Sequence, residues 1–105
     1  MIDIGIVHYR IKNENEIDAI WYSSRLDKKE TGKGIAIGDT SNGFPGEYKI
    51  TYFDPDGNDT GTFDLKIIKS GLVHELFWSL DGEVIFVGVG IETSDGFSAG
   101  WRKAQ

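Results

Sequence analysis

The chain has 105 residues, a formal net charge of −6 and no cysteine. A chain of this length forms a single domain with one hydrophobic core. The lack of cysteine excludes disulfide bonds and thiolate zinc sites. The acidic balance, without a run of Lys or Arg, argues against a phosphate-backbone partner. We therefore expect one domain over residues 1–105 that binds no nucleic acid.

The N-terminal residues, Met1 to Ile6, lack the basic region and long apolar stretch of a signal peptide. No apolar run approaches the ~20 residues that a membrane-spanning helix needs. These features predict a cytoplasmic protein without a membrane partner.

Apolar residues recur at every second position through most of the chain, and turn residues separate these stretches. This pattern is typical of short strands joined by hairpins. It predicts no long helix and eight strands, at roughly 4–11, 16–23, 32–38, 46–53, 60–69, 72–80, 83–92 and 96–103. Such strands, with no helix to cover their apolar face, must close or form a sandwich. Because most connections are short, we expect an all-β, up-and-down barrel with residues 24–31 as a polar loop at its mouth.

The last turns predict which side chains share a face, because loop length fixes the register of a hairpin. A two-residue turn at Asp81-Gly82 predicts the pairs Trp78–Ile85, Leu76–Val87 and His74–Val89. A two-residue turn at Ser70-Gly71 predicts the pairs Ile67–His74, Leu65–Leu76 and Phe63–Trp78. The longer turn over residues 54–59 predicts the pairs Ile50–Phe63 and Tyr48–Leu65. These pairs place one continuous apolar face inside the barrel.

Trp21 and the closing stretch Gly100-Trp101-Arg102, in an eight-stranded meander, resemble the calycin barrels, which include lipocalins, avidins and fatty-acid-binding proteins. In lipocalins a first-strand Gly-x-Trp packs near an arginine at the end of the last strand, and Trp21 with Arg102 is the nearest counterpart here. Trp21 lies in the second predicted strand and has Ala19 in the place of the motif's glycine. The resemblance implies a barrel that binds a small, largely apolar molecule.

His74 lies on the predicted apolar face, where a buried imidazole needs a partner. It either hydrogen-bonds a core tyrosine or water, or joins Tyr48 and Tyr52 at the base of a pocket, where it could also ligate haem iron. The interior of an eight-stranded barrel is just wide enough for side chains to fill it or for one small ligand to fit. The candidate ligand-binding residues are Trp21, Tyr48, Tyr52, His74, Trp78 and Trp101.

Other motifs carry no clear chemistry. Asp54-x-Asp56-x-Asn58 begins like a calcium loop but continues with Asp59 where glycine is needed, so it predicts a hairpin turn. The sequence contains no catalytic, metal or cofactor signature. The first hypothesis is therefore a non-enzymatic binding barrel. The alternatives are an interaction module with a filled barrel and a small enzyme using His74 and a tyrosine as acid and base.

The sequence also predicts an apolar patch on the outer face of the last three strands. Val73, Phe77, Val84 and Phe86 are predicted to face outward among Gly88, Gly90 and Gly100. Exposed apolar patches of this kind mark contact surfaces. We therefore expect a homodimer or higher oligomer through Phe77, Val84 and Phe86.

Overall fold

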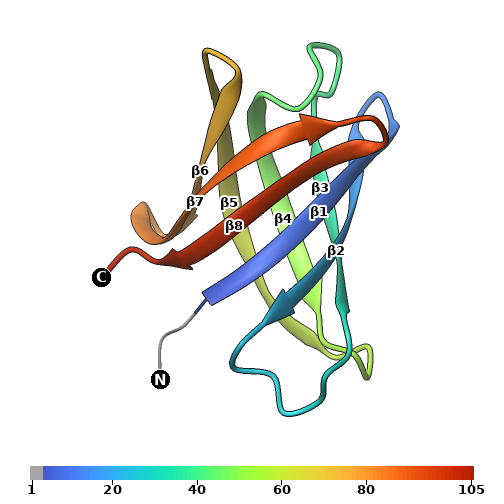
Figure 1. Ribbon diagram of the computed structural model, residues 1–105, viewed down its shortest axis with the longest axis vertical. Helices are drawn as coiled ribbons and strands as arrows, with labels where there is room; N and C mark the ends of the chain where they lie inside the picture. The colour runs from blue at the N-terminus through green and yellow to red at the C-terminus, as the bar shows by residue number, and fades with distance from the viewer. Residues whose placement is uncertain (1–3) are drawn as a thin grey trace.

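Eight antiparallel strands form a closed barrel in a computed structural model of the protein, which describes residues 4–105 (Figure 1). The strands are β1 (Ile4–Asn13), β2 (Glu16–Ser23), β3 (Gly32–Gly38), β4 (Gly46–Phe53), β5 (Asp59–Ser70), β6 (Val73–Leu80), β7 (Glu83–Thr93) and β8 (Gly96–Lys103). Each strand pairs with its sequence neighbours, and β8 pairs with β1. The predicted all-β, up-and-down barrel is confirmed, with every predicted strand present within two residues of its expected ends.

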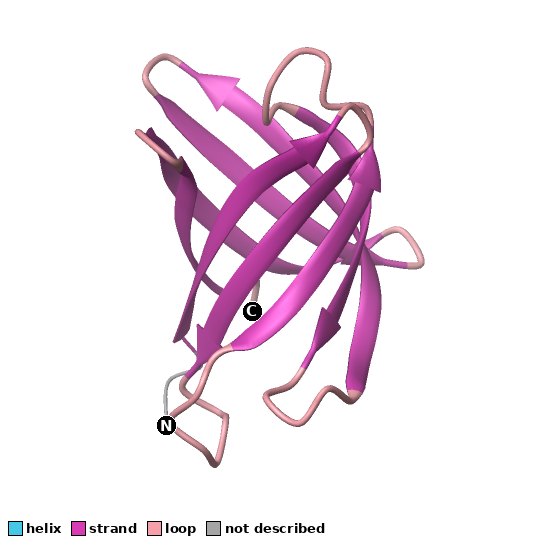
Figure 2. Ribbon diagram, turned by 90° about the vertical axis from the view of Figure 1, so that its right-hand side faces the viewer, coloured by secondary structure: helices cyan, strands magenta, loops and turns pink. Residues whose placement is uncertain are grey.

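The connections divide the barrel into two ends (Figures 1 and 2). One end carries the β1–β2, β5–β6 and β7–β8 turns and the 39–45 loop, and we call it the closed end. The other carries the 24–31 loop, the 54–58 turn and the 81–82 turn, and we call it the open end. Figure 2 draws only strands and loops over the described residues, and no helix there is long and apolar enough to cross a membrane.

The closed half of the barrel is filled. Alternate side chains of every strand point inward, and the most deeply buried are Val7, Tyr9, Ile17, Ile50, Leu65, His74, Leu76 and Phe97. Phe44, from the 39–45 loop, is buried at this end and stacks on Phe97 with ring centroids 5.3 Å apart. A loop residue therefore plugs the closed end, in addition to the residues that the strands supply.

Inward-facing glycines lie beneath several of the aromatic rings. A Cβ on Gly5 of β1 would overlap the indole of Trp101, its directly paired residue on β8. A Cβ on Gly32 would likewise overlap the indole of Trp21, which pairs with Gly32 across β2 and β3. Glycine thus lets a large ring lie flat against the barrel wall, as seen when aromatic residues cover strand glycines.

In two of the predicted hairpins, β4–β5 and β5–β6, the side chains lie on the faces predicted for them. The β4–β5 register matches the prediction, with Ile50 opposite Phe63. The β5–β6 turn is Gly71-Leu72 instead of Ser70-Gly71, and Gly71 has a φ of 68°, which suits the first position of a type II′ turn. The partners along β5 and β6 therefore shift by two residues, so Ile67 pairs with Leu76 and not with His74. A shift of two leaves every side chain on its predicted face.

The β6–β7 register is wrong beyond the turn. The Asp81-Gly82 turn forms as predicted, and Ser79 pairs with Val84. The next pair is Trp78 with Phe86, which leaves Ile85 as an extra residue, a β-bulge. The Ile85 carbonyl accepts a hydrogen bond from the Ala104 amide.

The bulge reverses the predicted facing of the rest of β7. Phe86 points into the barrel, where its ring packs edge-on against Phe63 and Trp101. Val87 and Val89 point outward, and Leu76 and His74 pair with Gly88 and Gly90 instead. Those two glycines face inward beneath the rings of Trp78 and Phe97.

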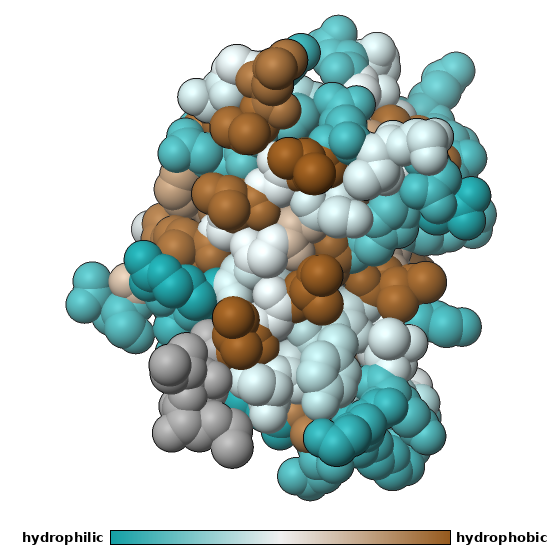
Figure 3. All heavy atoms as spheres, viewed as in Figure 1, coloured by the Kyte–Doolittle hydropathy of each residue, from teal (hydrophilic) through white to brown (hydrophobic). Residues whose placement is uncertain are grey.

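The outer apolar face consequently differs from the predicted patch. Phe86 is not part of it. Its members on β6, β7 and β1 are Ile4, Ile6, Val73, Phe77, Val84, Val87, Val89 and Ile91. Figure 3 shows apolar residues spread over this side of the molecule, where β7, β8 and β1 lie in Figure 1. The strand ladder places Val89 beside Gly100 and Gly100 beside Ile6, so the face is continuous across β8.

The lipocalin-like pairing of Trp21 with Arg102 does not occur. Trp21 points into the barrel. Arg102 is exposed, and one of its guanidinium nitrogens donates to the Lys103 carbonyl. The tryptophan at the β1–β8 closure is Trp101, which pairs with Gly5. Trp101 faces inward and its neighbour Arg102 faces outward, because inward and outward positions alternate along β8.

Candidate functional site

The open half of the barrel contains a cavity of about 320 Å³. We call it the aromatic cavity because six of its ten lining residues are aromatic. They come from the inner faces of the strands and from the 24–31 loop: Trp21, Ser23, Arg25, Leu26, Tyr52, Thr60, Phe63, Trp78, Phe86 and Trp101. Pockets of this kind, mostly apolar with a few polar groups, are the usual sites for small ligands.

Fixed contacts hold the wall of the aromatic cavity. The Trp21 indole N–H donates to the carbonyl oxygens of Lys33 (2.9 Å) and Phe53 (3.2 Å). Its ring meets the Tyr52 ring edge-on, with centroids 5.7 Å apart. On the opposite side, Trp101 meets Phe86 edge-on at 5.2 Å. These rings are therefore held in place without a ligand.

Three hydrogen-bonded side chains form the floor of the cavity. The indole N–H of Trp78, on β6, donates to the Tyr52 hydroxyl of β4 at 2.6 Å. That hydroxyl also lies 3.0 Å from the hydroxyl of Tyr9 on β1. Tyr52 and Trp78 line the cavity, whereas Tyr9 is fully buried beneath it. Burial raises the pKa of both tyrosines well above the ordinary value, so both hydroxyls stay protonated at neutral pH.

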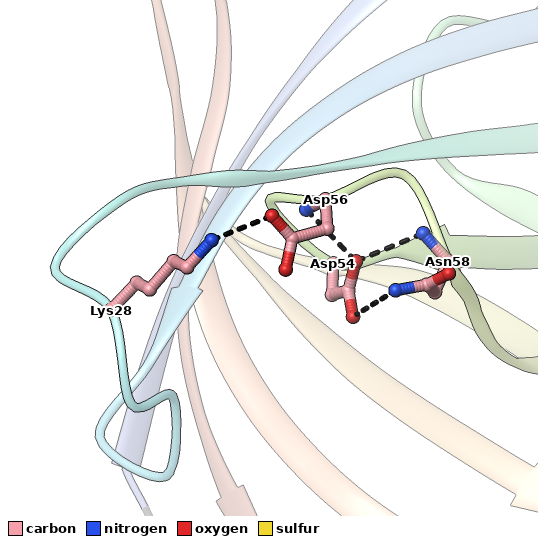
Figure 4. A network of polar contacts seen from close by, with 4 residues as sticks. All are labelled: Lys28, Asp54, Asp56 and Asn58. Carbon is pink, nitrogen blue, oxygen red and sulfur yellow. Dashed lines mark hydrogen bonds and ion pairs between the residues drawn. The ribbon is translucent and has the colours of Figure 1, made fainter.

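The 24–31 loop forms part of the rim and contributes Arg25 and Leu26 to the cavity. Its Lys28 ammonium donates to the Asp56 carboxylate at 2.7 Å, which joins this loop to the β4–β5 turn (Figure 4). Both side chains are exposed, and such ion pairs add little stability. The ion pair is therefore a weak, solvent-exposed link between this loop and the β4–β5 turn.

The β4–β5 turn is built by Asp54, as Figure 4 shows. One carboxylate oxygen accepts from the amides of Asp56 (3.0 Å) and Asn58 (2.9 Å). The Asn58 backbone bond is the main cause that lowers the pKa of Asp54. This stretch is thus a hairpin turn, as predicted. No group of three or more His, Asp or Glu side chains in residues 4–105 is placed to hold a metal ion.

Four of the predicted ligand-binding residues lie together in the aromatic cavity: Trp21, Tyr52, Trp78 and Trp101. The other two, Tyr48 and His74, lie at the closed end and do not line it. The Tyr48 hydroxyl donates to the Phe44 carbonyl at 2.8 Å, which helps to fix the plug. This pair is therefore part of the closed-end core.

His74 has surroundings that the sequence did not predict. Its ring is buried edge-on against Phe97, with centroids 4.9 Å apart. Neither ring nitrogen has a hydrogen-bond partner among the described residues, and Nε2 lies 3.6 Å from a Glu92 carboxylate oxygen. A bond to a core tyrosine, one of the two partners expected for a buried His74, is absent among the described residues. Because His74 does not line the cavity, it is separated from the proposed binding site.

Six lining residues were not among the predicted site residues: Ser23, Arg25, Leu26, Thr60, Phe63 and Phe86. Phe63 was predicted to face inward, and its position on β5 beside Tyr52 of β4 was the signal that could have added it. Phe86 was missed because the bulge at Ile85 reverses its facing. Arg25 and Leu26 lie in a loop, which carries no periodic signal.

Few ionisable side chains line the cavity. Among the described residues that line it, the only ionisable side chains are Tyr52 and Arg25. General acid–base catalysis near neutral pH uses groups with a pKa near the working pH, such as His or a perturbed carboxyl group. Comparison of the chain with protein-family models, curated proteins and solved structures found no match. The site therefore has to be interpreted from its own geometry.

Proposed function

We propose that the protein binds one small, largely apolar molecule in the aromatic cavity. The observation that carries this proposal is the cavity itself, about 320 Å³ of space lined mainly by rings at an open end of the barrel. Its volume lies at the lower limit of ligand pockets. A closed eight-stranded barrel of this size has room for a single small ligand. The calycin-like architecture agrees with this function, and membership of that group is part of the proposal.

The experiment measures binding of a panel of fatty acids, haem and small aromatic compounds by tryptophan fluorescence and melting temperature. All three tryptophans of the chain line the cavity, so occupancy should alter their emission. We expect small aromatic compounds to shift emission and raise the melting temperature. A panel in which no compound changes either quantity would contradict the proposal.

A filling variant makes this experiment specific to the cavity. Phe63→Trp adds volume to the cavity wall, between Tyr52 and Phe86. Calorimetry should show that binding is weakened at least tenfold. Phe77→Trp is the matched control, since Phe77 is half-buried on the outer face of β6. If both variants bind ligand equally well, the ligand occupies some other site.

Self-association is a second candidate function, favoured by the outer apolar face. Val89 is 65% exposed and Ile6 is 58% exposed, and both border Gly100 on β8. Monomeric proteins rarely expose such a continuous patch. The neighbouring charges have both signs, because Glu75 pairs with Val89 and Arg102 with Val87. Light scattering over micromolar concentrations tests for a contact between copies of this chain.

A further inference from the structure

The floor of the aromatic cavity has one more hydrogen-bond donor than it uses. Three protons meet there, on the Trp78 indole nitrogen and on the Tyr9 and Tyr52 hydroxyls. Hydrogen bonds join Trp78 to Tyr52 and the two hydroxyls to each other. The Trp78 indole also makes a hydrogen-bonding contact with Tyr9, and there too the indole N–H is the donor. Neither hydroxyl has a further acceptor among residues 4–105. One phenolic proton is therefore left without an acceptor.

Burial decides which tyrosine keeps that proton. If Tyr52 donated to Tyr9, the unpaired proton would belong to Tyr9, which is 0% exposed and does not line the cavity. An unpaired buried donor carries a large desolvation cost. If Tyr9 donates to Tyr52, the free proton lies on a residue that lines the cavity, where a ligand or water can accept it. The second arrangement is therefore the more stable one.

This arrangement also fills the acceptor capacity of the Tyr52 oxygen. A phenolic oxygen has two lone pairs. One accepts from the Trp78 indole N–H and the other from the Tyr9 hydroxyl. The Tyr52 hydroxyl can then act toward a ligand only as a donor.

We propose that the ligand is a neutral, largely apolar molecule with a hydrogen-bond acceptor, such as a carbonyl or ether oxygen, at the end that reaches the Tyr52 hydroxyl. This inference rests on the proposed function and specifies the class of ligand. A molecule that fills the cavity without an acceptor leaves the Tyr52 proton desolvated and unpaired, so it binds less tightly.

A neutral acceptor fits better than a carboxylate. The floor consists of two phenols and an indole, without a cationic side chain. Arg25, the cationic residue that lines the cavity, comes from the loop at the rim. A carboxylate buried at the floor would lose its hydration for one hydrogen bond and no opposite charge beside it. The net charge of −6 also repels anionic ligands.

The test compares benzophenone with diphenylmethane, two molecules of nearly the same shape that differ by the carbonyl oxygen. We expect calorimetry to give benzophenone about fivefold tighter binding after correction for aqueous solubility, the ratio that one net hydrogen bond supplies. The infrared stretching band of bound benzophenone should also move to lower frequency than in an apolar solvent. That band reports hydrogen bonding to the carbonyl oxygen directly.

Three variants separate the roles of the hydroxyls. Tyr52→Phe should abolish both the preference and the infrared shift. Because this change also removes the acceptor of Trp78, Tyr9→Phe serves as the second variant, and it should keep both, since Tyr52 still has its proton. Tyr48→Phe removes a hydroxyl that bonds Phe44 at the closed end and is the control.

The outcomes distinguish this inference from the proposed function. Equal binding of the two compounds, with an unshifted band, would leave the cavity as a binding site but overturn the acceptor requirement. A preference that is absent in the wild type and present only in Tyr9→Phe would show that Tyr52 donates to Tyr9, which also overturns it. If neither compound binds the wild type, the proposed function itself is contradicted.

Discussion

Replacement of Gly5 by alanine is the most direct test of how the wall of the aromatic cavity is built. An added Cβ at this inward-facing position would overlap the Trp101 indole, which is in turn packed against Phe86. Either the ring moves into the cavity or the β1–β8 pair that closes the barrel opens. Overpacking of this kind costs about 1–3 kcal/mol. At about 4 °C per kcal/mol for a domain of this size, the melting temperature should fall by roughly 4–12 °C.

Gly100→Ala is the matched control for this experiment. Gly100 lies on the neighbouring strand and faces outward, and the nearest atom to an added Cβ would be the Gly5 carbonyl oxygen at 3.9 Å. Its replacement should leave the melting temperature unchanged or raise it slightly. Scanning calorimetry measures both variants. Equal melting temperatures for the two variants would refute the view that glycine is needed beneath the ring.

Two further predictions concern the tyrosines and the outer face. Burial is the main cause that raises the pKa of Tyr9, Tyr48 and Tyr52, so phenolate absorbance should stay below that of four tyrosines as the pH passes about 10. Because the folded state holds these protons more tightly, their contribution to stability is complete below about pH 10 and is lost as the pH rises above it. Reversible ionisation of all four tyrosines near pH 10, with the fold intact, would contradict this. If the protein self-associates, Val89→Lys should give a monomer in light scattering, whereas Ile35→Lys on the far side of the barrel should not; a wild-type monomer at micromolar concentration would exclude the interface.

The fold could be predicted from the sequence because its main signals are local. Period-two alternation and short turns give the strands, and a meander of eight strands without helices closes most simply on itself. The turn at Asp81-Gly82 formed as predicted, whereas the β5–β6 turn lies one residue further along, at Gly71-Leu72, which shifted that register by two and kept every side chain on its predicted face. The predicted β6–β7 register failed beyond Ser79, because the bulge at Ile85 is stabilised by contacts from β5 and β8 that are distant in sequence. A single inserted residue then turned Phe86 inward and Val89 outward.

The site was predictable only in part for the same reason. Trp21, Tyr52, Trp78 and Trp101 follow from residue type and strand alternation. The division of the barrel into a filled and a hollow half depends on Phe44, a loop residue that plugs one end. No periodic pattern specifies where a loop side chain will pack. The sequence therefore does not decide whether the rings fill or line the barrel, and in the structure each alternative holds for one half.

Two of the large rings in the hollow half, Trp21 and Trp78, cannot turn inward without losing hydrogen-bond partners. Rotation of Trp21 into the cavity would leave its indole N–H without the Lys33 and Phe53 carbonyls. Rotation of Trp78 would break its bond to Tyr52. A buried donor left unpaired costs about 1–3 kcal/mol, which opposes the gain from filling the space. The hydrogen bonds of Trp21 and Trp78 therefore hold these two rings against the wall and the floor, which preorganises the cavity.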